Sequence, residues 1–127
     1  MKMYLNHLNL SVQNVAVARE FFETYFDFTA ADSKVNDTLT ILNGADGFLL
    51  VIMNERLNQN GNNAYPDSFH IGFYMENEDA VKDKFNRLKD GGVPVEQLPQ
   101  KIRRTFGFYF HFENIMIEIA CPVSAEE

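Results

Sequence analysis

The chain has very few residues that could cross-link it. Cys121 is the only cysteine among the 127 residues, so an internal disulfide cannot form and nothing indicates an oxidising compartment. It lies in "IACPV", where the simplest interpretation is a small buried hydrophobic residue. Tryptophan is absent, but phenylalanine occurs 12 times and 46% of the residues are hydrophobic. A single domain of this length can therefore bury a substantial core.

Basic residues are scarce relative to acidic ones. The chain has 11 Lys and Arg against 18 Asp and Glu, which gives a net charge of −7. This balance offers no electrostatic support for binding nucleic acid, and it argues against binding to anionic membranes. The simplest role of the charge is to keep the protein in solution.

Long apolar runs are also missing. No run approaches the length of a transmembrane helix, and in the N-terminal "MKMYLNHLNL" polar Asn and His residues interrupt the apolar ones. That pattern is not the layout of a signal peptide, so we expect a soluble, cytoplasmic protein.

The sequence contains an internal repeat. When the stretch from His7 is laid over the stretch from His70, Asn14 falls on Asn77 and Phe22 on Phe85, about half a chain length away. Each half has an alternating strand, an Asn suited to cap a helix, the helix itself and then three strand-like runs. These runs are 28–34, 37–42 and 47–54 in the first half, and 93–98, 104–112 and 114–120 in the second. The pattern predicts the order βαβββ twice, joined by the polar, Asn-rich loop "NERLNQNGNNAYPDS".

Both predicted helices have one apolar stripe. The first stripe contains Ala18, Phe21, Phe22, Tyr25 and Phe26, and the second contains Val81, Phe85 and Leu88. Gly91 and Gly92, followed by Pro94, should end the second helix.

Four predicted strands combine an apolar face with a face that carries ionisable or hydroxyl groups. Because side chains alternate along a strand, the second face holds these residues: His7, Asn9, Ser11; His70, Gly72, Tyr74; Gly107, Tyr109, His111; Met116, Glu118, Ala120. If such a sheet curves, it encloses a cavity that contains reactive groups.

Two histidines and one carboxylate on such a face can hold a divalent metal and leave coordination positions open for a substrate. We therefore interpret His7, His70 and Glu118 as candidate metal ligands. Each has a simpler explanation, since a strand histidine is often a hydrogen-bonded structural residue and Glu118 could pair with an arginine. Histidine at the same position of both repeats favours the metal-ligand interpretation.

The quoted motifs resemble a known family. "LNHLNLSVQNVAVAREFFETYF", "SFHIGFYMENEDAV" and "RTFGFYFHFENIMIEIA" are similar to segments of the vicinal-oxygen-chelate proteins, the glyoxalase, bleomycin-resistance and extradiol-dioxygenase superfamily. The resemblance runs from about Met3 to Pro122, although "HFEN" replaces the usual Asp-Pro-Asp-Gly turn. It implies an α+β fold in which two βαβββ modules form a cupped mixed sheet with the helices on the outer face. The single domain 1–127 would comprise module one (about 3–56), a linker (about 57–67) and module two (about 68–121).

The resemblance also implies a site and a chemistry. The family's ligand positions match His7, His70 and Glu118, which would hold Fe(II), Mn(II), Zn(II) or Ni(II). Members chelate adjacent oxygens of a small substrate, and the Lewis-acid charge stabilises an enolate or oxyanion. Members commonly form homodimers, and in some of them one site is shared between two subunits.

The chain departs from each characterised branch of the family. Glyoxalase I proteins add a fourth ligand, a Glu, on the last strand of module one; in "GFLLVIM" we expect that position at Leu50 or Ile52, and Glu55 has the opposite parity to Ile52. Extradiol dioxygenases need a histidine base on that strand, and none is present. Fosfomycin-resistance thiol transferases have a C-terminal extension with phosphonate-binding cations, whereas here only "IACPVSAEE" follows Glu118.

Two further residues are candidate catalytic groups. Tyr109 resembles the active-site Tyr that precedes the final Glu in extradiol dioxygenases, and it could donate a hydrogen bond to an oxyanion; a cross-strand aromatic contact is the alternative. His111 could be a general base, or a passive, partly exposed residue near a turn. Arg103 and Arg104 could meet an anionic substrate, or be solvated surface charges.

Two functions are compatible with these residues. The first is a metal-dependent enzyme acting on a small vicinally oxygenated substrate, by isomerase, lyase, dioxygenase or transferase chemistry. The second is a metal-free small-molecule binding protein of the bleomycin-resistance type, which the apolar strand "FLLVIM" favours.

Overall fold

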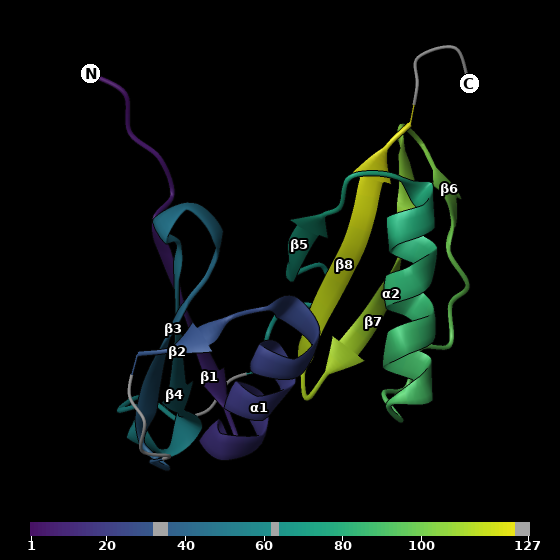
Figure 1. The fold of residues 1–127 in the computed structure, drawn as a ribbon. Coiled ribbons are helices and arrows are strands. Elements are labelled where there is room, and N and C mark those ends of the chain that lie inside the picture. Colours follow the sequence, from purple (N-terminus) through teal and green to yellow (C-terminus); the bar gives the residue numbers. More distant parts are fainter. Residues whose placement is uncertain (32–35, 62–63, 124–127) are drawn as a thin grey trace. The chain divides into compact units, whose positions relative to one another are not determined.

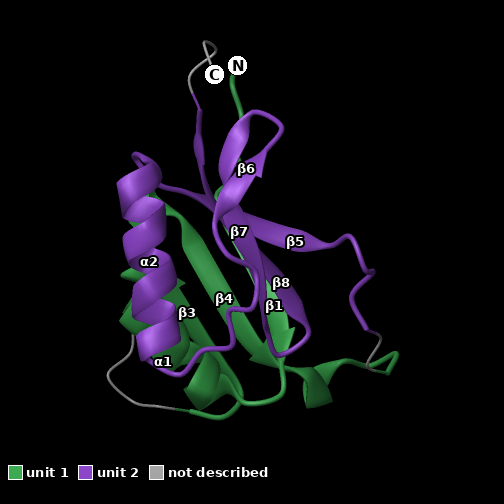
Figure 2. Ribbon diagram, turned by 90° about the vertical axis from the view of Figure 1, so that its right-hand side faces the viewer, with its two compact units in different colours: residues 1–63 green, residues 64–127 purple. Residues whose placement is uncertain are grey.

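The computed structural model describes residues 1–31, 36–61 and 64–123. The chain divides into two compact units, residues 1–63 and 64–127 (Figure 2). Each unit contains one α-helix and a mixed sheet of four strands (Figure 1). The predicted α+β class and the repeated βαβββ order are confirmed.

Unit 1 has a sheet with the strand order β1-β4-β3-β2. Strand β1 is parallel to β4, which pairs antiparallel with β3, and β3 pairs antiparallel with β2. Helix α1 packs on β3 and β4, so it covers one face of this sheet. The bounds are β1 His7–Val12, α1 Val15–Phe26, β2 Thr29–Ala30, β3 Leu39–Asn43 and β4 Leu49–Asn54, with short 3₁₀ turns at Ala45–Gly47 and Glu55–Leu57.

Unit 2 repeats this arrangement with the strand order β5-β8-β7-β6. Strand β5 is parallel to β8, β8 is antiparallel to β7, and β7 is antiparallel to β6. Helix α2 packs on β7 and β8, as Figure 1 shows. The bounds are β5 His70–Tyr74, α2 Glu78–Asp90, β6 Gln100–Ile102, β7 Thr105–Phe112 and β8 Ile115–Pro122.

Both helices begin at the predicted asparagine caps. The Asn14 side chain accepts a hydrogen bond from the Val17 N–H at 3.0 Å, and the Asn77 side chain accepts one from the Ala80 N–H at 2.9 Å. These bonds satisfy backbone donors that the first turn of a helix leaves unpaired. Gly91 follows the last residue of α2, as expected, and Gly92 has the positive φ of 87° that suits glycine after a helix.

Each unit has a core formed by apolar side chains of the predicted faces, although Ile71 and Phe73 of β5 are only half-buried. In β1, Leu10 and Val12 have no exposed surface, while His7 and Asn9 on the other face are exposed. Cys121 is fully buried, as expected. The core of unit 1 includes Val15, Ala18, Phe22, Leu42, Leu50 and Ile52, and that of unit 2 includes Val81, Phe85, Leu88, Phe108, Phe110, Ile115, Ile117 and Ile119.

The predicted strand at 93–98 is wrong. The edge strand β6 is at Gln100–Ile102 instead, and the preceding segment has no regular secondary structure. Pro94 and Pro99 explain this difference, since neither has an N–H for a sheet ladder and both restrict the backbone.

A side chain replaces part of the missing ladder. Continuing the register of β6 along β7 would place Leu98 opposite Tyr109, but the Tyr109 N–H instead donates to the Gln97 side-chain oxygen at 2.7 Å. One side-chain contact therefore satisfies a backbone donor that a paired strand would otherwise satisfy.

The other predicted strands shift by small amounts. The runs 37–42, 47–54, 104–112 and 114–120 correspond to β3, β4, β7 and β8, with ends displaced by one or two residues. The run 28–34 contains β2 at Thr29–Ala30, and its residues 32–34 lie outside the described residues. Neither α-helix of the described chain has the length and apolar character needed to cross a membrane.

Candidate functional site

The strand register of unit 2 brings three predicted site residues together. Glu118 of β8 is paired with Tyr109 of β7 on one side and with Gly72 of β5 on the other. His70 is two residues before Gly72, so its side chain lies on the same face of β5 as that position. This face is opposite the one that carries the buried Phe108 and Ile119.

His70 and Glu118 are in direct contact. His70 Nε2 lies 3.5 Å from Glu118 Oε1, and the two side chains are 38% and 19% exposed. The other ring nitrogen, Nδ1, is 3.0 Å from the Ser68 carbonyl oxygen. Because a carbonyl oxygen only accepts hydrogen bonds, Nδ1 must carry the proton, and in the neutral ring Nε2 then has a lone pair that faces the carboxylate.

This arrangement fits two of the ligands of a divalent metal. Two ligand atoms bound to one ion at about 2.1 Å are about 3.0–3.4 Å apart, close to the separation of Nε2 and Oε1. Metal-binding histidines also usually donate their second ring N–H to a carbonyl or carboxylate, as Nδ1 does here. A cation would remove the repulsion between the two facing lone pairs. Protonation of His70, which would make a simple ion pair, is the other way to remove it.

Tyr109 lies beside this pair. Its ring is 5.6 Å from the His70 ring, at an interplanar angle of 75°. Burial, the negative charge of Glu118 and a hydrogen bond with that carboxylate all raise the pKa of the Tyr109 hydroxyl above its usual value, while Arg103 lowers it. The hydroxyl therefore remains protonated at neutral pH and can donate a hydrogen bond.

Gly72 leaves space above the carboxylate. A Cβ atom built at this position would lie 3.5 Å from Glu118 Oε1, at ordinary van der Waals distance. A longer side chain would occupy the volume next to the Glu118 oxygen. The sequence indicated this space only through a glycine on the ionisable face of the strand.

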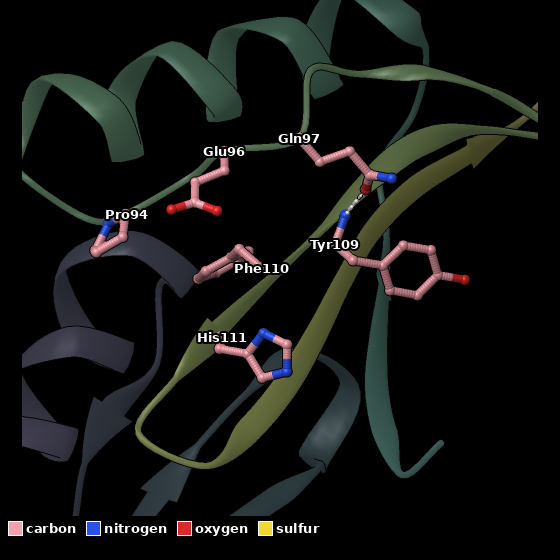
Figure 3. A pocket seen from close by; sticks show the side chains of 6 residues that line it. All are labelled: Pro94, Glu96, Gln97, Tyr109, Phe110 and His111. Carbon is pink, nitrogen blue, oxygen red and sulfur yellow. Dashed lines mark hydrogen bonds between the residues drawn. The ribbon is translucent and has the colours of Figure 1, made fainter. Parts of the chain in front are cut away.

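Two cavities in unit 2 meet at Tyr109. One has a volume of about 620 Å³ and is lined by Ile102, Arg103, Arg104, Thr105, Tyr109 and Glu118. The other, of about 460 Å³, is lined by Pro94, Glu96, Gln97, Tyr109, Phe110 and His111 (Figure 3). In Figure 3 the rings of Tyr109 and His111 extend to the same side of β7. His111 is exposed and lies in the second cavity, outside the lining of the cavity that contains Glu118.

His7 belongs to unit 1. It is the first residue of β1, it is exposed, and its Nδ1 is 3.4 Å from the Asn6 side-chain oxygen. Within residues 1–31, 36–61 and 64–123, no group of three or more His, Cys, Asp or Glu side chains is arranged to hold a metal. The contact between His70 and Glu118 is thus the part of the predicted ligand set that the structure brings together.

The expected position of a fourth ligand needs correction. Leu50 and Ile52 are 2% and 0% exposed, so they belong to the core face of β4. The parallel strand pairs of the two units give the corresponding position. Asn9, two residues after His7, is paired with Val51, just as Gly72, two residues after His70, is paired with Glu118. The position is therefore Val51, which is also apolar, while Glu55 lies beyond the strand in a 3₁₀ turn.

The chain belongs to a known superfamily. The model of the Glyoxalase/Bleomycin resistance protein/Dioxygenase superfamily matches residues 4–118, which confirms the resemblance found in the sequence. Members of this superfamily commonly use divalent metals and bind small molecules. No curated protein matches the chain.

Solved structures show the same fold. A possible glyoxalase from Bacillus cereus is 36% identical, with a TM-score of 0.78 over 94% of this chain and 100% of that one. A lactoylglutathione lyase from Agrobacterium tumefaciens is 15% identical, with a TM-score of 0.73 over 95% of both chains. A genomically encoded fosfomycin resistance protein from Listeria monocytogenes is 22% identical, with a TM-score of 0.72 over 99% of this chain and 98% of that one.

Proposed function

We propose that the protein is a metal-dependent enzyme that chelates a small substrate through two adjacent oxygens. In this proposal His7, His70 and Glu118 hold a divalent ion, which is Fe(II), Mn(II), Zn(II) or Ni(II). The main support is the 3.5 Å contact between His70 Nε2 and Glu118 Oε1, together with the hydrogen bond that commits Nδ1 of the same ring to Ser68. Membership of the superfamily and the similarity to the possible glyoxalase add support.

The protein side chains have separate roles in this proposal. The bound ion supplies Lewis-acid charge that stabilises negative charge developing on a substrate oxygen. Tyr109 keeps its proton at neutral pH and donates a hydrogen bond to a substrate oxygen beside Glu118. His111 acts as the general base at the edge of the neighbouring cavity. Isomerase, lyase, dioxygenase and transferase reactions share this chelation step.

A second candidate function is metal-free binding of a small molecule, as in bleomycin-resistance proteins. Val51 supports this function, because it is the residue of unit 1 that corresponds to Glu118 of unit 2, and it is apolar. Neighbouring Leu49 and Met53 extend this apolar surface. A site that holds ligands by apolar contact alone would not need the contact between His70 and Glu118.

Metal analysis separates the two functions. We expect purified protein loaded with Zn(II) or Mn(II) and then desalted to retain one ion per site, and His70→Ala and Glu118→Gln to bind at least about tenfold more weakly because each lacks a ligand. His111→Ala is the matched control, since it removes a histidine outside the ligand set, and it should retain the metal. If wild type retains no more metal than His70→Ala, the enzyme proposal is wrong. A screen for thermal stabilisation by ligands in metal-free protein then tests the second function.

The proposal also includes the number of subunits in the protein and the kind of ligand that it binds. We expect a homodimer, as is common in the superfamily, and a small molecule as the bound ligand. Sedimentation equilibrium with and without metal measures the subunit number. A monomer at all accessible concentrations would contradict the dimer but would not affect the metal test.

A further inference from the structure

Two arginines form the loop between β6 and β7. Ile102 pairs with Thr105, so Arg103 and Arg104 are the two residues of a tight hairpin. The Thr105 hydroxyl donates to the Ile102 carbonyl oxygen at 3.0 Å, and the Val123 N–H donates to the Arg104 carbonyl oxygen at 3.1 Å. Arg103 has a positive φ of 56°, a conformation that few residues other than glycine adopt. The loop is therefore held in place although both side chains are exposed.

No described residue neutralises either guanidinium group. Within the described part of the chain, the side chains of Arg103 and Arg104 form no hydrogen bond and no ion pair. Arg19 and Arg56, in contrast, pair with Glu23 and Asp37 at 3.4 and 2.8 Å. Two adjacent cations that pair with no described side chain are notable in a chain whose net charge is −7.

These arginines line the same cavity as Glu118. The cavity of about 620 Å³ is lined by the hairpin residues Ile102, Arg103, Arg104 and Thr105 and by Tyr109 and Glu118. Its volume lies in the range of small-molecule sites. One small molecule could therefore contact the carboxylate end and the arginine end at the same time.

We propose that Arg103 and Arg104 bind a distal carboxylate of the substrate. This inference rests on the proposed function, which assigns the vicinal oxygens of the substrate to the end of the cavity at Glu118. The substrate class is then a small aliphatic acid with adjacent oxygens at one end and a second carboxylate at the other. Guanidinium groups suit that second group, because their planar fork of N–H donors matches a carboxylate.

The backbone of β7 separates the hairpin from Tyr109. Thr105 and Tyr109 are four residues apart on β7, which corresponds to about 14 Å along the strand. We therefore expect a carbon chain between the two polar ends of the substrate. The negative charge of Glu118 repels a second anion, so the distal carboxylate is oriented toward the hairpin.

Two six-carbon acids test the inference. α-Hydroxyadipate and α-hydroxyhexanoate share the same chelating end, and only the first has a distal carboxylate. In calorimetric titrations of protein loaded with Mn(II), we expect wild type to bind α-hydroxyadipate about tenfold more tightly, which corresponds to one charge-assisted contact of about 1.4 kcal/mol. Arg103→Gln/Arg104→Gln should bind the two acids equally.

Lys101→Gln is the matched control. It removes one positive charge from the neighbouring strand β6, at an exposed residue outside the cavity lining, and should keep the preference for α-hydroxyadipate. Melting temperature and metal content should be the same in all variants. Equal affinity of wild type for the two acids would overturn the inference. So would a loss of preference in Lys101→Gln as large as the loss in Arg103→Gln/Arg104→Gln.

The same experiment separates this inference from the metal proposal. If metal binding fails, titration of metal-free protein with adipate and hexanoate still tests the arginines. A preference for adipate that disappears in the double variant supports the anion site without the metal. Retained metal with no preference for the dicarboxylate overturns the anion site alone.

Discussion

His70 illustrates how a backbone atom determines the chemistry of a side chain. The Ser68 carbonyl oxygen holds the proton on Nδ1, so Nε2 is left facing Glu118. The sequence placed both residues on one face through their parity, and the burial pattern confirms that face. It could not indicate the Ser68 contact, because backbone hydrogen bonds outside regular elements have no sequence pattern. The role of His7 as a ligand stays a prediction.

Tyr109 gives a prediction about pH. Its pKa is raised above 10.0 in the folded protein, chiefly by burial and next by the charge of Glu118. The folded state thus holds this proton more tightly than the unfolded chain. The resulting stabilisation is fully present below pH 10 and is lost as pH rises through the higher, folded-state pKa. We expect Tyr109→Phe to lose less stability than wild type above pH 10, in urea unfolding at a series of pH values.

Tyr74→Phe is the control for this experiment. Tyr74 is 70% exposed on β5, and its replacement should not reproduce the effect of Tyr109→Phe. Tyrosinate absorbance, followed over the same pH range, reports the ionisation of the tyrosines. In Tyr109→Phe it should lose the contribution of the tyrosine whose pKa is raised. Identical unfolding profiles for Tyr109→Phe and wild type would show that Tyr109 has no such coupling.

At the scale of elements, helices are easier to predict than edge strands. Helix boundaries follow from local signals, namely Asn14 and Asn77 as caps and Gly91 as the stop. Strand β6 depends on pairing with β7, which local sequence does not specify. The fourth-ligand position was missed for a related reason, since only the register shows that Val51 corresponds to Glu118.

The cap of α2 can be tested directly. Asn77→Ala removes the acceptor for the Ala80 N–H, which is 2.9 Å from the Asn77 oxygen. We expect the free energy of unfolding to fall by about 1 kcal/mol. Asn86→Ala, at an exposed position inside the same helix, should change stability by less than about 0.5 kcal/mol. Equal effects of the two substitutions in urea unfolding would contradict a capping role.

At the scale of the whole molecule, the duplicated pattern is the most informative feature of the sequence. The two units share their element order, their strand order and their parallel pairing of first and last strands. Both parallel pairs place a histidine at the start of the first strand, His7 in one unit and His70 in the other. The repeat alone therefore predicts the fold class, whereas the identities of the residues around the site differ between the units.

Each unit has a fully buried phenylalanine in its core. Phe22 in unit 1 and Phe108 in unit 2 have no exposed surface. We expect Phe22→Ala and Phe108→Ala each to lower the free energy of unfolding by about 3–5 kcal/mol, because each leaves a cavity. Leu98→Ala, at a position that is 68% exposed, should have little effect in the same urea titration. A loss below about 1 kcal/mol for either phenylalanine would show that its core position contributes little.

The hydrogen bond between Gln97 and the Tyr109 backbone has an evolutionary consequence. Residues 93–99 supply Pro94, Glu96 and Gln97 to the wall of a cavity, yet no sheet ladder fixes their sequence (Figure 3). Substitutions there alter the polarity and size of that wall while the pairing of β7 with β8 stays intact. Descendants of this protein could acquire new ligand preferences by drift in this short stretch, without first having to restabilise the scaffold.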